Sequence, residues 1–547
     1  MGSTHVSQQP VSRPKVTLSD LQAEFRGAVP FGQALLRKLT QEGAENTFIR
    51  RPGKPGGPWL LRVKLPPSLQ ERFALAPEVL LMALGDTEVE ARDVDRCSME
   101  IAGAGARLDS EVVIVVDLKA GLFGRLQRLD RRRPWVLWQP SVSKRGVAFP
   151  PLFEQIAKQI GENDIFEERD PVRGHQVIGR REDIRKLSNS LLAGKSVGVF
   201  GLRKVGKTTL VRAVTDRLDP EGSALSVRRS PGEPWLLDTD DPSQVAAIWV
   251  DCQVLYPRTV ERLASLLVAQ LWARLPDAMT SQKGSEVERL LELLEHWSRG
   301  EDLPLTIVLD EYDLLFQGAK GEDAIGGLDV LFGGLRAVSQ TTSRLALAVI
   351  GRDPSYFRQP TWNGVPNPML NWFIPQWVGP LDWKGADDLL GTLGRRIGLL
   401  VGKRTKAHAY EWTGGHPLLH RQYGSAIRTL VRSKGKHSEE VETDPFCEEA
   451  VEHFLERDAV VDTCREIFDI LGTRYPRASA LLEEMSLAEA SARARIVVAH
   501  GGFRGEPAQV LRNFGILAGA PESPALPEVI CWYARNVHPS SNRSAAQ

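Results

Sequence analysis

Apolar residues gather in short runs that alternate with amphipathic polar stretches along most of the chain. Within residues 19 to 165, four such runs stand out at Trp59–Val63, Val79–Leu84, Val112–Val116 and Trp135–Trp138. Uniformly apolar, β-branched runs are typical of strands that are covered on both faces. This rhythm predicts a small N-terminal α/β domain, to which the sequence assigns no role.

Two of these predicted strands are followed by carboxylates. Asp86 comes shortly after Leu84, and Asp117 directly follows Val116. Ligand sites open at the carboxyl ends of parallel strands, so the two side chains could face one crevice as metal ligands or sensors. The alternative, which we favour, is that both are solvated loop carboxylates, because Asp is a common turn former at strand ends.

A second α/β pattern begins near Val177 and contains a phosphate-binding motif. The apolar strand Val197–Phe200 leads into GLRKVGKTT and then into a helical pattern, which is a complete Walker A motif in its required setting. The glycines let backbone N–H groups surround phosphates, Lys207 reaches the β and γ oxygens, and the Thr208 hydroxyl binds Mg²⁺. We therefore predict ATP and Mg²⁺ as cofactors. The predicted binding residues are Gly201, Val205, Gly206, Lys207, Thr208 and Thr209.

A strand that ends in adjacent carboxylates lies about one hundred residues further on. Leu305–Leu309 is apolar and is followed by Asp310 and Glu311, as in a Walker B motif. Asp310 would hold the magnesium ion, and Glu311 would polarise the attacking water as general base. The alternative is an ordinary capped strand end. Asp313 is expected to cap a helix or lie on the surface.

A third apolar strand, Leu345–Ile350, ends next to Arg352. A planar guanidinium binds phosphate oxygens well, so Arg352 could contact the γ-phosphate and report its hydrolysis. We count it with Lys207 and Glu311 as the predicted catalytic residues. The alternative is a structural or solvent-exposed arginine.

Together these segments resemble the STAND and archaeal-type P-loop ATPases of the AAA+ class, which are similar to Orc/Cdc6 initiators. The resemblance covers about residues 172 to 535 and is carried by both Walker motifs and by the strand ending in Arg352. It also rests on Val177–Glu182, which looks like the family's GRxxE segment, and on Thr413–Leu418, which looks like its GG.P signature.

The resemblance implies a P-loop AAA+ (ASCE) α/β core, a helical lid and a C-terminal winged helix, preceded by the small α/β domain. The expected boundaries are a flexible tail at 1–18, the N-terminal domain at 19–165, the core at 172–382, the lid at 383–435, the winged helix at 446–535 and a polar tail at 536–547. Residues 218 to 244 are rich in Pro, Gly, Ser and Asp and predict an insertion within the core.

The resemblance also implies further site residues. Ile178 and Gly179 would line the adenine base, Pro417 would pack near it, and Arg352 would be the sensor-1 arginine. His416 would be either a phosphate contact or only the variable residue of its motif.

The expected winged helix would contain a helix at Cys464–Leu471, a third helix at Glu506–Phe514 and a hairpin-like stretch from Ile516 to Tyr533. Such a fold binds DNA in the major groove or only packs against the lid. The candidate third helix carries a single arginine, Arg512, which favours packing.

Composition narrows the choice of partners and compartment. Lys and Arg number 69 and Asp and Glu number 69, so the formal net charge is zero and does not steer the molecule toward nucleic acid or anionic membrane. The five cysteines contain no CxxC pair, which fits a reduced compartment. The chain has no apolar run of membrane-spanning length and no signal-peptide pattern, so we expect a cytoplasmic protein.

These observations predict a P-loop ATPase that acts as a slow regulatory switch. Because no repeat array of fixed period is seen, the expected sensor or effector is the N-terminal domain or a protein partner, and self-association is expected from the class. An alternative is an initiator-type protein whose winged helix binds DNA under ATP control. A third is a scaffold that ATP stabilises without turnover, against which Glu311 argues.

Overall fold

The computed structural model contains two compact units, Met1–Asn163 and Asp164–Gln547, each with its own hydrophobic core. The structure describes residues 17–73, 75–84, 89–102, 108–118, 121–130, 135–143, 146–160, 164–167, 177–219, 244–275, 284–300, 303–316, 325–434 and 444–538. Most of both predicted tails and most of the predicted 218–244 insertion fall outside these ranges.

The first unit is built on a mixed five-stranded sheet in the order β1-β2-β3-β4-β5. The middle strand, β3, is antiparallel to β2 and parallel to β4, and β4 is parallel to β5. The strands are β1 (Glu45–Arg50), β2 (Trp59–Lys64), β3 (Glu78–Ala83), β4 (Leu108–Val116) and β5 (Trp135–Leu137), with a separate hairpin of β6 (Ser141–Ser143) and β7 (Gly146–Ala148). The helices are α1 (Leu18–Ala28), α2 (Gly32–Gln41), α3 (Pro67–Phe73), α4 (Ala91–Ala102), α5 (Gly121–Leu129) and α6 (Leu152–Ile160).

Strands β2 to β5 overlap the four apolar runs of the sequence, because most of their side chains in these runs are buried in the sheet; β4 begins at Leu108, before its run. Strand β1 was not predicted. It lies at the edge of the sheet, and Ile49 is its only fully buried residue, so its sequence ENTFIR carries little apolar signal.

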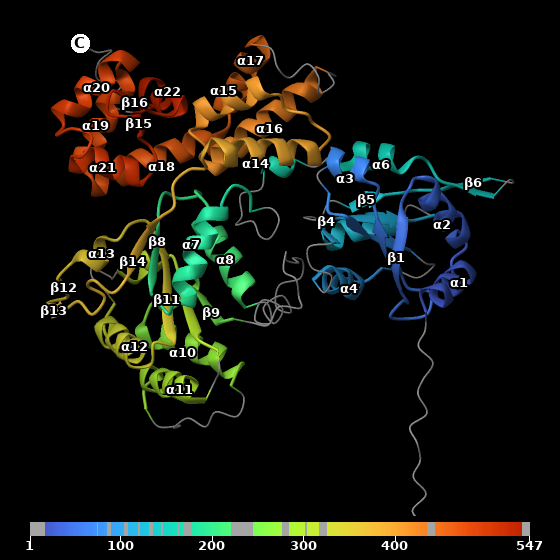
Figure 1. Ribbon diagram of the computed structural model, residues 1–547, viewed down its shortest axis with the longest axis horizontal. Helices are drawn as coiled ribbons and strands as arrows, with labels where there is room; N and C mark the ends of the chain where they lie inside the picture. The colour runs from blue at the N-terminus through green and yellow to red at the C-terminus, as the bar shows by residue number, and fades with distance from the viewer. Residues whose placement is uncertain are drawn as a thin grey trace, which may run out of the picture. The chain divides into compact units, whose positions relative to one another are not determined.

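The second unit contains a five-stranded sheet in which every neighbouring pair is parallel, in the order β14-β8-β11-β10-β9 (Figure 1). The strands are β8 (Val197–Phe200), β9 (Ala246–Asp251), β10 (Leu305–Asp310), β11 (Leu345–Gly351) and β14 (Ile374–Trp377). In this order β11 lies between the P-loop strand β8 and the Walker B strand β10. The predicted P-loop α/β core is therefore confirmed as a fold.

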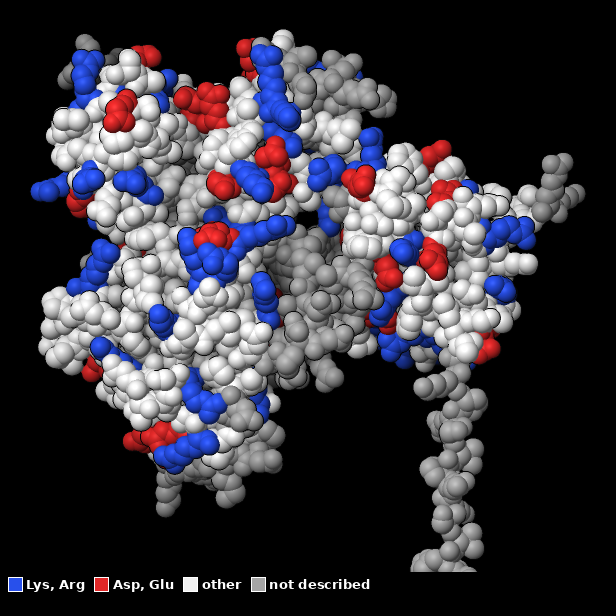
Figure 2. Space-filling view, viewed as in Figure 1, with Lys and Arg blue, Asp and Glu red and all other residues white. Residues whose placement is uncertain are grey.

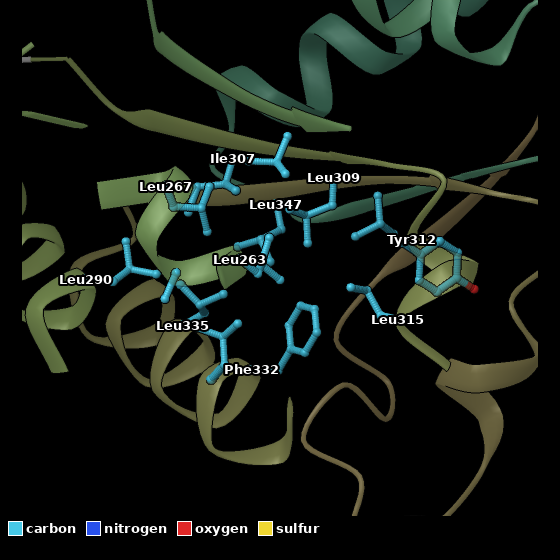
Figure 3. Close-up of a cluster of buried hydrophobic side chains, with 14 of the residues drawn as sticks. Leu263, Leu267, Leu290, Ile307, Leu309, Tyr312, Leu315, Phe332, Leu335 and Leu347 are labelled. Atoms are coloured by element: carbon cyan, nitrogen blue, oxygen red, sulfur yellow. The ribbon is translucent and has the colours of Figure 1, made fainter. Parts of the chain in front are cut away.

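Alternate residues of β10 and β11 face one hydrophobic cluster. Ile307, Leu309 and Leu347 point toward three helices, α10 (Val260–Trp272), α11 (Glu286–Gly300) and α12 (Leu328–Thr342), whose leucines fill the space between them (Figure 3). Helix α7 (Arg181–Leu192) packs on α8 (Lys207–Leu218), which contacts β11. The buried leucine and valine side chains of α8 are separate from this cluster.

Helices follow the sheet to the end of the described chain. They are α14 (Trp383–Arg396), α15 (Lys403–Thr413), α16 (Pro417–Ser433), α17 (Asp444–Leu455), α18 (Asp458–Arg474), α19 (Pro476–Leu487), α20 (Ala490–Ala499), α21 (Glu506–Asn513) and α22 (Glu528–Asn536). A two-stranded hairpin, β15 (Ala518–Ala520) and β16 (Ser523–Ala525), separates α21 from α22.

The predicted hairpin-like stretch from Ile516 to Tyr533 is wrong in its second half. Residues 528–536 form α22, in which Val529, Ile530 and Tyr533 are buried on one helical face. The short apolar run VICWY is compatible with a strand and with a helix. The spacing of its buried residues is that of a helix. Helix α18 is also longer than the predicted Cys464–Leu471.

All five cysteines are buried and unpaired with one another. Among the described helices, none combines the length and the apolar character that crossing a bilayer requires.

Candidate nucleotide-binding site

The P-loop joins β8 to α8 through backbone conformations that only glycine adopts easily. Gly201 has φ of +153° and Gly206 has φ of +97°. A Cβ atom on Gly201 would lie 2.4 Å from the carbonyl oxygen of Val378, so the loop also passes close to the chain that follows β14. The loop ends at the N-terminus of α8, whose first residue is Lys207.

Lys207 is buried and hydrogen-bonded within its own loop. Its Nζ donates to the carbonyl oxygens of Gly201 at 3.0 Å and Leu202 at 2.8 Å. Burial lowers the pKa of Lys207, while the nearby carboxylates of Glu311, Asp313 and Asp310 act in the opposite direction. The ammonium group therefore lies among the predicted Walker B side chains.

Thr208 and Asp310 meet across the site. The Thr208 hydroxyl donates to Asp310 Oδ1 at 3.3 Å. Burial and the neighbouring Glu311 raise the pKa of Asp310 to about 6. Within the described ranges, no group of three or more His, Cys, Asp or Glu side chains is placed to hold a metal ion. Mg²⁺ needs no such group, because one or two carboxylates, a hydroxyl, water and phosphate oxygens complete its octahedron.

Glu311 occupies a strained position between two elements. Strand β10 ends at Asp310, a 3₁₀ turn begins at Tyr312, and Glu311 between them has φ of +52°. Its N–H donates to Asp310 Oδ1 at 3.0 Å. A non-glycine residue in the left-handed region costs about 1–3 kcal/mol, and such strain is concentrated at functional sites.

Asp313, which was expected to cap a helix or lie on the surface, is instead buried beside the site. Its side chain is only 2% exposed, and its Oδ2 accepts the backbone N–H of Arg352 at 2.8 Å. The reason is the tight turn of Tyr312–Phe316, which returns the carboxylate beneath the end of β11. Gly351 provides the room, since a Cβ atom there would lie 2.6 Å from Asp313 Oδ2. Burial raises the pKa of Asp313 to about 7.

The segment before α7 and the GG.P segment both reach the P-loop region. Gly179, with φ of +75°, packs so closely on α14 that its Cβ would lie 2.5 Å from the Cα of Gly385. Ile178 beside it is half-buried. His416 is buried with Nε2 3.3 Å from the carbonyl oxygen of Arg203, and Pro417 is the first residue of α16. Burial lowers the pKa of His416 to about 4.

The arrangement places predicted site residues from three neighbouring strand ends together. Lys207 and Thr208 follow β8, Asp310 ends β10 and Glu311 follows it. Arg352 follows β11, which lies between β8 and β10. Arg352 is partly exposed, and its charge is close enough to Lys207 to lower the pKa of that lysine. Val205 is buried and Thr209 is half-buried on the first turn of α8. Such a cluster of cations and carboxylates can bind a polyphosphate with a divalent cation.

No protein-family model and no curated protein matches the chain. Solved structures similar to it include the Walker-type ATPase of Pyrococcus abyssi, with 18% identity and a TM-score of 0.43 over 68% of this chain and 99% of that chain. The ORC2 protein of Aeropyrum pernix has 14% identity and a TM-score of 0.41 over 70% and 99% of the two chains. The RuvB Holliday junction branch migration motor of Thermotoga maritima has 11% identity and a TM-score of 0.32 over 68% and 99%.

Arg180 is a candidate residue that sequence reasoning missed. Its buried guanidinium donates through Nη2 to the carbonyl oxygens of Val205 at 2.8 Å and Gly379 at 2.7 Å, and through Nη1 to Asp183 at 3.2 Å. It thus ties the P-loop to the segment after β14. The signal in the sequence is its place in the Val177–Glu182 segment, directly after Gly179.

The carboxylates considered in the first unit form no such site among the described residues. Asp117 is buried, and its Oδ2 accepts the N–H groups of Leu122 at 3.1 Å and Phe123 at 3.0 Å at the start of α5. Asp117 therefore has a structural role at a turn, as we favoured, but the prediction that it is solvated is wrong, because its side chain is only 2% exposed. Asp86 lies outside the described residues.

Proposed function

We propose that this chain binds ATP with Mg²⁺ and hydrolyses it slowly, as a STAND or AAA+-type switch that couples nucleotide state to its N-terminal unit. The observation that carries the proposal is the convergence of Lys207, Asp310, Glu311 and Arg352 at the carboxyl ends of β8, β10 and β11. Ligands of parallel α/β sheets bind at this edge.

Phosphate binding would exchange the partners of Lys207. Its ammonium group now donates to two loop carbonyls, and the β and γ oxygens of ATP are stronger acceptors for a buried cation. The N-terminus of α8 adds the partial positive charge of its free N–H groups. Both contributions favour a di- or triphosphate over a neutral ligand.

The Thr208 hydroxyl and the Asp310 carboxylate would hold the magnesium ion, because they already lie within hydrogen-bonding distance of each other. When bound, the ion neutralises charge on the phosphate oxygens. Magnesium binding requires Asp310 to be ionised, and its raised pKa makes this requirement depend on pH near 6.

Glu311 would accept the proton of the attacking water, from a position directly after the end of β10 and with a left-handed backbone conformation. Arg352 would donate to the γ-phosphate from the adjacent strand end. The backbone N–H of Arg352 donates to Asp313. Loss of the γ-phosphate would therefore change the contacts of Arg352 and could shift the chain that follows β11.

Helix α21 supports the switch over the DNA-binding alternative. Its single arginine, Arg512, lies over the ring of Phe503 at 4.7 Å. Phe514 at its C-terminal end is buried and lies against Trp377 of β14, with ring centroids 5.3 Å apart. A helix used in this way packs the C-terminal helices onto the core. On the face seen in Figure 2, acidic and basic side chains are interspersed, as on α7, where Glu182 pairs with Arg185.

Nucleotide affinity of the full chain tests the site. We expect Lys207→Ala to weaken ATP binding at least tenfold, because it removes the cation that contacts the β and γ phosphates, while the surface variant Lys195→Ala keeps the affinity of the parent. Calorimetric titration with ATP and Mg²⁺ measures both. Equal affinity in Lys207→Ala and the parent would rule out this site.

ATP turnover of the full chain, measured with and without duplex DNA, distinguishes the proposed switch from the initiator-type alternative. Turnover that duplex DNA stimulates, with a stimulation that fades as salt rises, would favour the initiator-type alternative. Turnover indifferent to DNA at two salt concentrations is the result that the switch predicts.

A further inference from the structure

A short segment at the beginning of the second unit is held by the helices that follow the ATPase sheet. Asp164 to Glu167, which we call the connector, continues the chain from the N-terminal unit and contains a 3₁₀ turn at Ile165–Glu167. Its contacts are with α16 and with Arg457, the residue before α18.

An apolar side chain anchors the connector to α16. Phe166 is completely buried, and its ring lies where a side chain on Gly424 would be, since a Cβ atom there would approach the ring to 2.4 Å. Burial of this large apolar side chain stabilises the contact through the hydrophobic effect. The glycine in the middle of a 17-residue helix, which costs helix stability, is thereby explained.

Polar contacts surround this anchor, and their charges are complementary. Arg421 Nη2 donates to the carbonyl oxygen of Ile165 at 2.7 Å, and Arg428 Nη1 lies 3.4 Å from Asp164 Oδ2. Arg457 pairs with Glu167. The α16 residues that touch the connector are Arg421, Gly424, Ser425 and Arg428, which follow the i, i+3, i+4, i+7 spacing of one helix face.

Helix α18 reaches from the connector to the nucleotide site. Arg457 precedes it, and Arg474, its last residue, lies 3.5 Å from Asp353 and donates to the Tyr356 hydroxyl at 3.1 Å. Asp353 directly follows Arg352. A helix of 17 residues spans about 25 Å. Midway along it, Glu466 pairs with Arg203 of the P-loop at 3.6 Å.

We infer that the face of α16 around Gly424, together with Arg457, is a docking site for the connector, and that α18 couples this docking to the nucleotide at the P-loop and Arg352. The inference rests on the proposed function. Figure 1 shows α16 and α18 beside each other, and they are in contact. Both helices also touch the P-loop backbone or side chains, α16 through His416 before its first residue.

Thermodynamic linkage makes the coupling reciprocal. If ATP favours the undocked connector, then weakening the docking must tighten ATP binding by the same factor. If ATP favours the docked connector, weakening the docking must loosen ATP binding. The experiment decides whether ATP favours the docked or the undocked connector. Linkage requires that the effect of ATP on docking and the effect of weakened docking on ATP affinity agree in sign.

Amide hydrogen exchange of the connector in full-length Glu311→Gln protein is the first measurement, with and without ATP and Mg²⁺. We expect the exchange rate at Ile165 to Glu167 to change at least tenfold on ATP binding. The second measurement is ATP affinity in Phe166→Ala and Arg457→Glu, where we expect a shift of at least fivefold with the sign required by the exchange data.

A charge swap separates docking from a merely structural role. The double variant Glu167→Arg with Arg457→Glu restores opposite charges and should return ATP affinity to within threefold of the parent. Arg299→Glu, which breaks an exposed pair with Glu295 on α11, is the matched control and should leave affinity unchanged.

Three outcomes overturn the inference while leaving the ATPase proposal intact. They are ATP binding with no change in connector exchange, signs that disagree, and single variants whose defects the charge swap does not relieve. Failure of the parent to bind ATP would instead overturn the proposed function.

Discussion

Buried carboxylates next to the P-loop give the site its sensitivity to pH. Asp313 is 2% exposed, with one oxygen fixed by the N–H of Arg352, and its pKa is raised to about 7 because burial disfavours the charged form. The pKa of Asp310 is also raised, to about 6. Both groups therefore bind protons more tightly in the folded chain than in the unfolded chain, where the value is about 3.8.

The consequence is a stability term that is fully present below pH 3.8 and is lost as pH rises through the folded pKa values. Asp313→Asn keeps an oxygen for Arg352 and cannot ionise. We expect the melting temperature of the variant, relative to the parent, to rise between about pH 4 and pH 7 and to level off above pH 7. Scanning calorimetry without nucleotide measures this. A difference independent of pH would show that Asp313 has an ordinary pKa.

At the scale of elements, a glycine pair sets how closely the segment before α7 approaches α14. Gly179 has φ of +75°, and a Cβ atom on Gly385 would lie 2.9 Å from the Cα of Gly179. No larger residue fits on either side of this contact. The contact brings the expected adenine-side residues Ile178 and Gly179 to the first turn of α14.

Gly179→Ala should lower the free energy of unfolding by about 1–3 kcal/mol, because the new methyl group meets Gly385 and the backbone is left-handed. We also expect ATP affinity to fall by tenfold or more. Gly333→Ala is the control, since its Cβ meets nothing within 4 Å and alanine favours the helix α12. Urea unfolding and ATP titration measure both variants. Equal stability of Gly179→Ala and the parent would contradict the contact.

How much the sequence predicted depended on the kind of element. Buried parallel strands such as Leu305–Asp310 were predicted because both faces are apolar. The edge strand Glu45–Arg50 was missed, and the helix Glu528–Asn536 was taken for a strand because five apolar or aromatic letters fit both periods. The order β14-β8-β11-β10-β9 depends on long-range pairing, which no local pattern contains.

The residues of the candidate site also fall into those that local motifs predicted and those that they did not. Lys207, Thr208 and Asp310 were predicted from motifs whose spacing encodes their geometry, and the structure places them together. Arg180 and Asp313 were not recognised, because their roles come from contacts with Gly379 and with the backbone of Arg352, far away in the sequence.

For the molecule as a whole, the charge and the packing of the C-terminal helices support the proposed switch over the initiator-type alternative that binds DNA. The net charge of zero provides no general attraction for DNA, and the C-terminal helices pack on the core through Phe514, Trp377 and Tyr475. We propose that a change in nucleotide state reaches the connector through α16 and α18.

The central claim is that ATP is hydrolysed at this site with Glu311 as general base. Single-turnover ATP hydrolysis by the full chain and by Glu311→Gln, with ATP affinity measured for both, tests it most directly, and Glu295→Gln on the surface of α11 is the matched control. We predict that Glu311→Gln binds ATP as the parent does and hydrolyses it about 10²- to 10⁴-fold more slowly. Equal hydrolysis rates in Glu311→Gln and the parent would contradict the account.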